Sequence, residues 1–156
     1  MTSLNIGSGG KCPEEGWYGI DLFTDCDIKT PMWDLNMFEN ESVEEIYSSH
    51  SLEHISKHQV MPTLKEWFRV LQHGGKLHLL VPDLEWCCKH WIEHQNDGWD
   101  LDIIFGHQAH DGEYHKTGFS KQLLHTYMGR VGMVIDSIDF IPTHGQQTIE
   151  MWAHKP

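Results

Sequence analysis

Short runs in which apolar and polar residues alternate predict β-strands, because successive side chains of a strand point to opposite faces. Such runs cover Leu4–Ile6, Trp17–Leu22, Val43–Ser49, Lys76–Val81, Val134–Ile141 and Thr148–His154, and a further short strand is predicted near Ile28. Apolar residues three or four positions apart predict helices instead. This spacing covers Val60–Leu71 and Leu84–His94. A third helix is predicted to open at Phe119 or Ser120, and the side chain of Ser120 suits an N-cap.

The order of these elements predicts an α/β fold. Strands alternate with helices, and the chain closes with two strands joined by a turn within 142–147. We therefore expect a mostly parallel sheet with an antiparallel C-terminal edge strand. Gly74 and Gly75 are expected to end the first helix as a C-cap. Because the chain shows no internal repeat and no linker, residues 1–156 are predicted to form a single domain.

Composition narrows the classes of partner. The formal net charge is −12, from 23 acidic residues against 11 Lys and Arg, so a nucleic acid backbone would be repelled. No apolar run is long enough to span a bilayer, and the N-terminus lacks a secretory signal pattern, so we expect a cytoplasmic protein that binds no membrane. Reduced thiols are expected for the cysteines, which lack CxxC spacing: Cys12, Cys26, Cys87 and Cys88.

Candidate ligand-binding residues lie at the carboxyl ends of the predicted strands, the edge where open α/β sheets bind ligands. The first strand ends in the glycine turn 7–10, the second in Asp21, and the strand from Val43 in Ser49-His50-Ser51. Glycines let a backbone approach a ligand closely, and an acid after the second strand can accept hydrogen bonds from ribose hydroxyls. The sequence therefore predicts a nucleoside-type ligand.

The short connection after the glycine turn separates two kinds of nucleoside ligand. A dinucleotide site needs a helix whose N-terminus faces the pyrophosphate. Residues 11–16 are too few for that helix, and Pro13, Glu14 and Glu15 would put negative charge beside the phosphates. NAD and ATP are therefore disfavoured, whereas S-adenosylmethionine, which has no phosphate, is compatible with this turn.

Four segments resemble the motifs of class I S-adenosylmethionine-dependent methyltransferases. They are LNIGSGG from Leu4, GIDL from Gly19, EIYSSHSLEHI from Glu45 and LKEWFRVLQHGGKLHLLVPDL from Leu64. The similarity is greatest to a methyltransferase type 11-like subgroup of small enzymes with a shortened first crossover. The resemblance implies a Rossmann-like fold whose first helix is reduced or absent, so that a flanking segment or a homodimer contact would cover part of one sheet face.

The resemblance also implies roles for individual residues. The amino-acid end of the cofactor would lie against the glycine turn, the ribose against Asp21, and the adenine near Asp34 and Leu35, where Trp33 could stack on it. The methionine portion would lie beside Ser49-His50-Ser51. The full set of expected cofactor-binding residues is Asn5, Gly7, Ser8, Gly9, Asp21, Leu22, Asp34, Leu35, Ser49, His50 and Ser51.

Thirteen histidines is a high number for this length. His50 and His54 could act as general bases on an incoming hydroxyl or amine, and His115 is a third catalytic candidate. Residues 106–119 lie where class I methyltransferases place their substrate-side insertion. The residues expected to face the acceptor are His107, His110, Tyr114 and His115.

Two further groups of residues allow more than one interpretation. His107, His110, Asp111 and His115 could ligate a metal, but their spacing fits no recognised zinc motif and no metal is assigned. Among the tryptophans, Trp67 and Trp91 are expected in the core, and Trp86 and Trp99 near the substrate.

We therefore predict methyl transfer from S-adenosylmethionine to a small-molecule or sugar-type acceptor. One alternative is a non-catalytic S-adenosylmethionine-binding module or partner subunit. Another is a metal-dependent hydrolase built on the histidine-rich residues 106–119.

Overall fold

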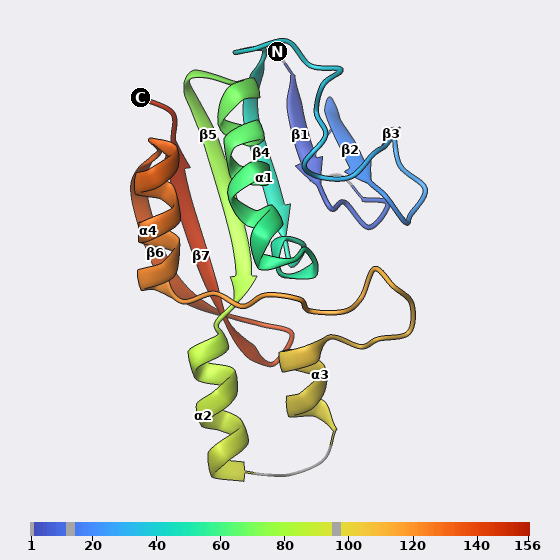
Figure 1. Ribbon diagram of the computed structural model, residues 1–156, viewed down its shortest axis with the longest axis vertical. Helices are drawn as coiled ribbons and strands as arrows, with labels where there is room; N and C mark the ends of the chain where they lie inside the picture. The colour runs from blue at the N-terminus through green and yellow to red at the C-terminus, as the bar shows by residue number, and fades with distance from the viewer. Residues whose placement is uncertain (1, 12–14, 95–97) are drawn as a thin grey trace.

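The sheet has seven strands, and its order brings the expected site residues together. The computed structural model describes residues 2–11, 15–94 and 98–156. The strands are β1 (Ser3–Ile6), β2 (Trp17–Asp21), β3 (Ile28–Lys29), β4 (Val43–Ser49), β5 (Leu71–Pro82), β6 (Val134–Thr143) and β7 (Gln146–His154), in the order β3-β2-β1-β4-β5-β7-β6 (Figure 1). All neighbours are parallel except β7, which runs antiparallel to β5 and β6. The predicted α/β fold with a mostly parallel sheet is confirmed.

The register places the glycine turn between two other strand ends. Asn5 of β1 pairs with Gly19 of β2 on one side and with Tyr47 of β4 on the other. Because the three strands run in the same direction, their carboxyl ends meet at one edge. The backbone N–H of Gly7 then donates to the carbonyl of Ile20 at 2.8 Å, which holds the turn against β2.

Helices α1 (Lys57–Val70) and α4 (Lys121–Val131) cover the same face of the sheet (Figure 1). The apolar stripe of α1 is buried there through Val60, Leu64 and Trp67. Ser120 caps α4 as predicted, since its hydroxyl accepts a hydrogen bond from the Leu123 N–H at 3.2 Å. The sheet side of this core includes Leu4, Ile6, Ile46, Leu77, Leu79, Val81, Ile149, Met151 and Ala153.

The opposite face of the sheet carries no helix within the described residues (Figure 1). Tyr47, His78 and Trp152 form a cross-strand row on it, with ring centroids 5.1 Å apart for the first pair and 3.8 Å for the second. Between β1 and β2 the described residues form turns, which agrees with a shortened crossover. Pro13 and Glu14 lie outside the described residues.

The boundaries of α1 differ from the predicted ones. The helix begins at Lys57, three residues before the predicted start. Periodicity could not detect this first turn, because Lys57 to Gln59 include no apolar residue. It ends at Val70, and Leu71 already belongs to β5. The predicted glycine C-cap is therefore wrong. Gly74 and Gly75 instead lie in an irregular stretch of β5, where the pairing with β4 shifts register.

Helices α2 (Leu84–His94) and α3 (Trp99–Phe105) lie beyond the carboxyl ends of the strands (Figure 1). The bounds of α2 are as predicted, but its apolar residues are not core. Cys87 is buried, Trp91 is half-buried and Ile92 is 68% exposed. The prediction that Trp91 lies in the core is wrong, because α2 packs mainly on α3 and not on the sheet. The short helix α3 has no extended apolar pattern and is not predicted from the sequence.

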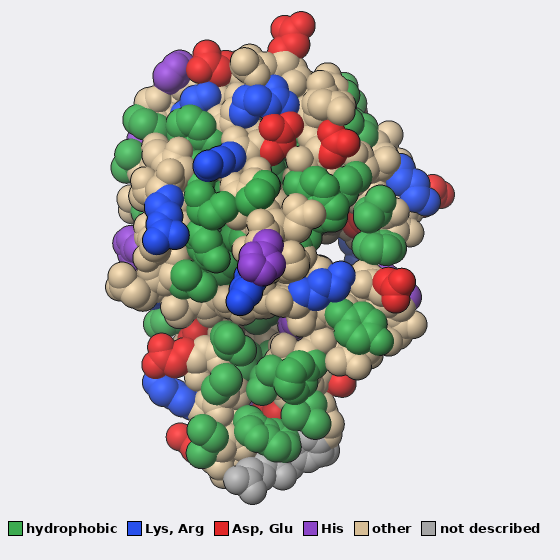
Figure 2. Space-filling model, viewed as in Figure 1, with side chains coloured by type: hydrophobic (Ala, Val, Ile, Leu, Met, Phe, Trp, Pro, Cys, Tyr) green, Lys and Arg blue, Asp and Glu red, His purple; other side chains and the backbone are tan. Residues whose placement is uncertain are grey.

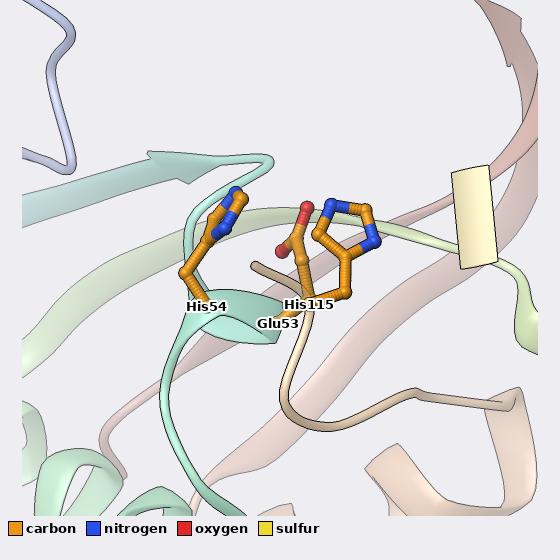
Figure 3. A group of neighbouring side chains, drawn as sticks. All are labelled: Glu53, His54 and His115. Carbon is orange, nitrogen blue, oxygen red and sulfur yellow. The ribbon is translucent and has the colours of Figure 1, made fainter. Parts of the chain in front are cut away.

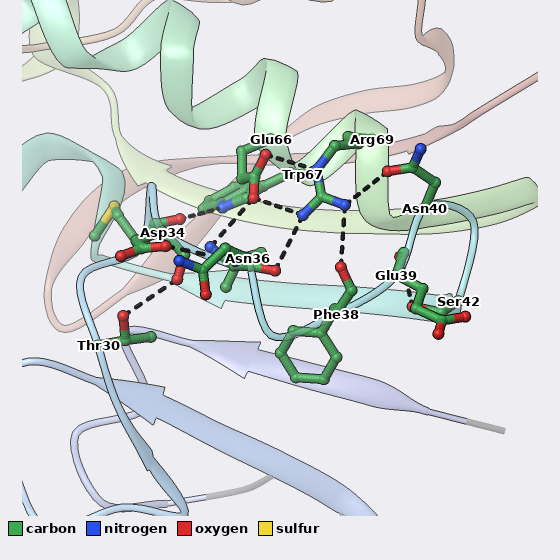
Figure 4. A network of polar contacts seen from close by, with 12 residues as sticks. Thr30, Asp34, Asn36, Phe38, Glu39, Asn40, Ser42, Glu66, Trp67 and Arg69 are labelled. Carbon is green, nitrogen blue, oxygen red and sulfur yellow. Dashed lines mark hydrogen bonds and ion pairs between the residues drawn. The ribbon is translucent and has the colours of Figure 1, made fainter.

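A polar network holds the segment between β3 and β4 on α1 (Figure 4). Arg69 donates to both carboxylate oxygens of Glu66, at 2.7 and 2.8 Å. It also donates to the backbone carbonyls of Leu35 and Phe38, both at 3.0 Å. Hydrogen bonding to Arg69 lowers the pKa of Glu66. Since Arg69 belongs to the Arg-Val-Leu-x-x-Gly-Gly run, this motif positions the chain that leads from β3 to the candidate site.

The described cysteines are free thiols, and none of the described helices has the properties of a membrane span. Cys26, Cys87 and Cys88 are free thiols, and Cys12 lies outside the described residues. Burial raises the pKa of Cys87 to about 12, so its thiol is protonated at neutral pH. In the described part of the chain, no helix combines the length and the apolar character that a membrane span needs.

Candidate active site

A cavity of about 240 Å³, called here the glycine-turn cavity, lies at the carboxyl ends of β1, β2 and β4. Of the residues expected to bind a cofactor, it is lined by Gly7, Gly9, Asp21, Leu22, His50 and Ser51. The loops after β2 and β3 add Phe23, Thr24, Thr30 and Met32. Residues 110–113 close it from the side of the histidine-rich segment. The cavity therefore lies at the sheet edge where the sequence predicts a nucleoside ligand.

The glycine turn is held in a conformation that only glycine fits. Gly7 has a φ of +72°, and a Cβ at this position would lie 2.1 Å from the Ser51 hydroxyl oxygen. That hydroxyl is within hydrogen-bonding distance of two backbone carbonyls, those of Gly7 at 3.2 Å and Ser49 at 3.0 Å. The turn after β1 and the end of β4 are thus packed directly against each other, which leaves a backbone-lined wall for a ligand.

Asp21 lies at the end of β2 and organises the same wall. Its carboxylate accepts hydrogen bonds from the backbone N–H groups of Gly9 at 2.9 Å, Phe23 at 2.8 Å and Thr24 at 3.0 Å. Burial alone would raise the pKa of Asp21, but the N–H groups of Thr24, Phe23 and Gly9 hold it below its ordinary value. An ionised carboxylate offers about four acceptor sites, so roughly one is left for a ligand hydroxyl.

Several residues of the expected cofactor set lie outside the glycine-turn cavity. Asn5 and Ser8 are buried and support the turn: Asn5 donates to the Lys11 carbonyl, and the Ser8 hydroxyl accepts from the Gly10 N–H. Ser49 contributes a carbonyl to Ser51. Asp34 and Leu35 belong to the Arg69 network (Figure 4), and Leu35 is fully buried. Thr30 and Met32 line the cavity instead. The residues after Asp34 do not, because Leu35 and Phe38 are hydrogen-bonded to side chains of α1.

A second cavity of about 320 Å³, the Trp33 cavity, adjoins the first. The two share five lining residues: Leu22, Phe23, Met32, His54 and Gly112. Trp33 lines only this second cavity. A ligand longer than the glycine-turn cavity can therefore extend toward the indole, the residue expected to stack on adenine.

On the other side lies a cavity of about 370 Å³, the histidine cavity. Its walls come from the segment after β4, from α3 and the loop after it, and from the β6–β7 turn. They comprise His50, Glu53, His54, Trp99, Asp102, Ile103, Gly106, His107, Glu113, His115, His144 and Gln146. His50, His54 and Glu113 line both this cavity and the glycine-turn cavity, so the two sites meet at these side chains.

Three of these side chains converge: Glu53, His54 and His115 (Figure 3). One ligand atom from each lies within 4.8 Å of the others. His54 and His115 approach edge to face, with ring centroids 4.8 Å apart. Glu53 is almost completely buried, at 1% exposure. The predicted catalytic residues His54 and His115 are therefore neighbours in space although they are distant in sequence. The Nδ1 of His54 also contacts the carbonyl of Tyr114, the residue before His115.

The other residues predicted to face the acceptor lie in different parts of the site. His107 lines the histidine cavity and lies 3.6 Å from Asp102. His110 lines the glycine-turn cavity, beside the ring of Phe23. Tyr114 contributes its backbone carbonyl to His54. The sequence also suggested a metal site formed by Asp111 and three histidines of residues 106–119. Within the described part of the chain, the ligand atoms of these four residues do not form a cluster.

Among the residues that line the histidine cavity, Glu53 and His144 are not predicted from the sequence, whereas Trp99 is. Glu53 lies between two predicted bases, but nothing in its spacing reveals that it is buried. Trp99 was expected near the substrate and lines the cavity, whereas Trp86 does not. His144 comes from the β6–β7 turn, and its ring lies 5.5 Å from that of His50, centroid to centroid. Only the folded arrangement brings this turn beside β4.

Figure 2 shows how the surface is arranged around these cavities. An opening separates the part of the molecule that carries β1–β3 from the loop of residues 106–119. Hydrophobic side chains gather over α2 and α3, where Leu101 and Phe105 are 40% and 53% exposed. The site is therefore accessible from this face, between the sheet edge and the histidine-rich loop.

Comparison with solved structures identifies the fold as that of class I S-adenosylmethionine-dependent methyltransferases. A Burkholderia thailandensis 1,6-didemethyltoxoflavin N1-methyltransferase, with bound 1,6-didemethyltoxoflavin and S-adenosylhomocysteine, matches with a TM-score of 0.71 and 14% identity, over 99% of this chain and 70% of that one. A Methanosarcina mazei methyltransferase matches at 0.69 and 17%, over 99% and 92%. A Streptomyces coelicolor geranyl diphosphate C-methyltransferase matches at 0.65 and 14%, over 99% and 72%.

A family model also matches part of the chain. Residues 18–79, from β2 into β5, match the family model described as a methyltransferase domain. No curated protein matches the chain. The matched segment and the fold together confirm the resemblance to class I S-adenosylmethionine-dependent methyltransferases, and at identities of 14–17% the structural likeness concerns the fold alone.

Proposed function

We propose that the protein transfers a methyl group from S-adenosylmethionine to a small-molecule or sugar-type acceptor. The observation that carries this proposal is the meeting of two cavities at His50, His54 and Glu113. One cavity is formed by the glycine turn and Asp21, and the other is lined by histidines. A reaction between two ligands requires such an arrangement, because each must be held in line with the other.

The described residues fit the cofactor on three grounds. Gly7 lets the turn pack directly against Ser51 at a positive φ, so that the wall of the cavity is backbone that a ligand can approach closely. Asp21 is held in its charged form by backbone N–H groups and keeps acceptor capacity for a ribose hydroxyl. The glycine-turn and Trp33 cavities together fall in the range of about 300–1,000 Å³ that small-ligand sites occupy. Bound there, S-adenosylmethionine would supply an electrophilic methyl group at its sulfonium.

The histidines would then bind and deprotonate the acceptor. His50 is placed between the cavities, with its Nε2 3.2 Å from the Thr143 hydroxyl and its Nδ1 3.7 Å from a Glu53 oxygen. The hydrogen bond to Thr143 would orient the ring for proton transfer. Burial lowers the pKa of His115, so its imidazole is neutral at pH 7. His54 and His115 are the other candidate bases, and His107 would contact the far side of the acceptor.

Cavity size and net charge support the proposed class of acceptor. A cavity of about 370 Å³ suits a small molecule, and a net charge of −12 disfavours a nucleic acid. Solved relatives of this fold methylate nitrogen in one case and carbon in another, as their names state. The fold therefore does not select the acceptor atom.

Calorimetry with S-adenosylmethionine and S-adenosylhomocysteine tests the cofactor placement. Asp21→Ala removes one charge-assisted bond to the ribose and disturbs the turn, so binding is expected to weaken by about 1.5–3 kcal/mol, or roughly 10- to 150-fold. Asp25→Ala, at an exposed aspartate of the same loop, is the matched control and should bind as the wild type does. Equal affinity for wild type and Asp21→Ala would exclude this placement.

The two alternative functions predicted from the sequence have weaker support than methyl transfer. Tight cofactor binding without turnover on a broad acceptor panel would favour the non-catalytic module. The hydrolase is not favoured, because the histidines of residues 106–119 lie in different places. The homodimer stays a prediction, for which the row of Tyr47, His78 and Trp152 on the helix-free face offers a contact surface, and analytical ultracentrifugation is the test.

A further inference from the structure

We propose that Glu53, His54 and His115 bind a divalent metal ion of the zinc type at the wall of the histidine cavity (Figure 3). One carboxylate and two imidazoles are a common donor set for Zn²⁺ in enzymes. Their ligand atoms lie within 4.8 Å of one another. Bonds of about 2.0–2.2 Å would bring these atoms to roughly 3–4 Å apart, so small side-chain rotations complete the site.

The buried carboxylate is the strongest observation for a cation. Glu53 is 1% exposed, and within the described part of the chain neither of its carboxylate oxygens has a hydrogen-bond partner. The nearest basic group is His50, whose Nδ1 lies 3.7 Å from one oxygen, too far for a hydrogen bond. Its backbone is fixed, because the Glu53 carbonyl accepts from the N–H groups of Lys116 and Thr117. A bound cation would compensate the charge of this carboxylate.

Each of the two imidazoles is fixed by a hydrogen bond to a backbone carbonyl. The Nδ1 of His115 lies 2.9 Å from the Ile103 carbonyl, and the Nδ1 of His54 lies 3.3 Å from the Tyr114 carbonyl. A carbonyl can only accept, so each Nδ1 carries the proton and each Nε2 keeps its lone pair. Metal-binding histidines typically have this second hydrogen bond, which fixes the tautomer and the ring.

The metal would define the acceptor that the proposed function leaves open, and this step rests on that function. Three protein ligands leave a coordination position for a ligand from the cavity. An oxygen bound there loses its proton more easily, and His50, beside Glu53, could accept it. We therefore expect an acceptor with an ionisable oxygen, such as an enol or a phenol, with His54 and His115 acting as ligands and His50 as base.

Zn²⁺ binding to untagged, chelator-treated protein tests the site without cofactor or acceptor. Calorimetry should show one tight site in the wild type, with affinity reduced at least about 100-fold in Glu53→Gln and in His115→Gln. Co²⁺ should give the visible spectrum of a low-coordinate complex only when all three side chains are present. Thermal unfolding in chelator shows that the variants fold, and Glu53→Gln should be no less stable than the wild type, because it removes an unpaired buried carboxylate.

Two histidine controls make the result specific. His107→Gln, in the same cavity but outside the three, and His125→Gln, exposed on α4, should change Zn²⁺ affinity less than about twofold. An affinity unchanged by Glu53→Gln and His115→Gln, or reduced as much by His107→Gln, would overturn the assignment. S-adenosylhomocysteine binding measured in chelator separates the two proposals: if it persists while the metal site fails, only the metal site falls.

Discussion

The glycine-turn cavity takes its walls mainly from short segments that directly follow parallel strands, whereas the histidine cavity takes its walls from segments far apart in the chain. In the first, residues 7–9, 21–24 and 50–51 are brought together by the pairing of β1 with β2 and β4. In the second, residues 50–54 meet α3, the loop after it and the β6–β7 turn. Sheet topology alone positions the first, and tertiary contacts position the second.

This difference has a consequence for binding. A wall of backbone groups at strand ends is fixed by the pairing of the strands, so its shape depends on the glycines and on Asp21 more than on other side chains. A wall of side chains from loops can change residue by residue while the sheet stays intact. Cofactor binding should therefore be sensitive to backbone conformation, and acceptor choice to side chains.

Gly7→Ala should have the largest effect. The added Cβ would lie 2.1 Å from the Ser51 hydroxyl oxygen at a φ of +72°, and a left-handed alanine adds roughly 1–2 kcal/mol of strain. The turn must move, so S-adenosylhomocysteine affinity should fall at least about 100-fold, or about 2.7 kcal/mol, by calorimetry. Gly129→Ala, on the exposed side of α4 with nothing within 4 Å, is the control and should bind normally. Binding of Gly7→Ala within threefold of wild type would mean that backbone geometry does not set this cavity.

Gly106→Ala applies the same change to the histidine cavity. Its Cβ would lie 1.8 Å from the Glu113 carbonyl oxygen, at a φ of +82°, so residues 106–119 should loosen. Hydrogen exchange of residues 107–115 should accelerate. The affinity for S-adenosylhomocysteine should fall only about tenfold, or about 1.4 kcal/mol, because this loop contributes one side of the glycine-turn cavity. A loss as large as that of Gly7→Ala would contradict the division between the two cavities.

The same division explains what could be predicted from sequence. Strands such as Val43–Ser49 could be predicted because apolar residues recur at every second position. The glycine turn and Asp21 could be predicted as ligand-binding residues because they lie at the carboxyl ends of strands. The burial of Leu35 could not be predicted, because it accompanies a hydrogen bond from Arg69, which is distant in sequence. The glycines at 74 and 75 resemble a helix cap, but β5 uses them for a register shift that only the pairing with β4 reveals.

The histidine cavity was beyond sequence reasoning for a related reason. His54 and His115 were each candidates, but their proximity depends on one loop crossing the end of β4. Glu53 reads as an ordinary surface acid at a helix start, and its burial comes from that loop, through the N–H groups of Lys116 and Thr117. Periodicity describes a residue's own element and carries no information on such crossings.

The smallest expected effect concerns the pH dependence of Asp21. Burial tends to raise its pKa, but the N–H groups of Thr24, Phe23 and Gly9 leave it lowered overall. A carboxyl group whose pKa is lowered by folding binds a proton more weakly in the folded state than in the unfolded state. Asp21 therefore stabilises the fold above the ordinary pKa of aspartate, about 3.9, and this contribution is lost as the pH falls through the folded-state pKa.

Asp21→Asn isolates that contribution. The asparagine oxygen can still accept from Phe23 and Thr24, but its amide would face the Gly9 N–H, so one bond is lost and the variant should be about 1 kcal/mol less stable at pH 7. Urea unfolding from pH 7 to pH 3 should show this difference shrinking as the wild type is protonated, whereas Asp25→Asn should stay within about 0.5 kcal/mol of wild type at pH 7. A difference that is constant down to pH 3 would show that the charge of Asp21 does not hold the turn, and that the shape of its side chain alone does.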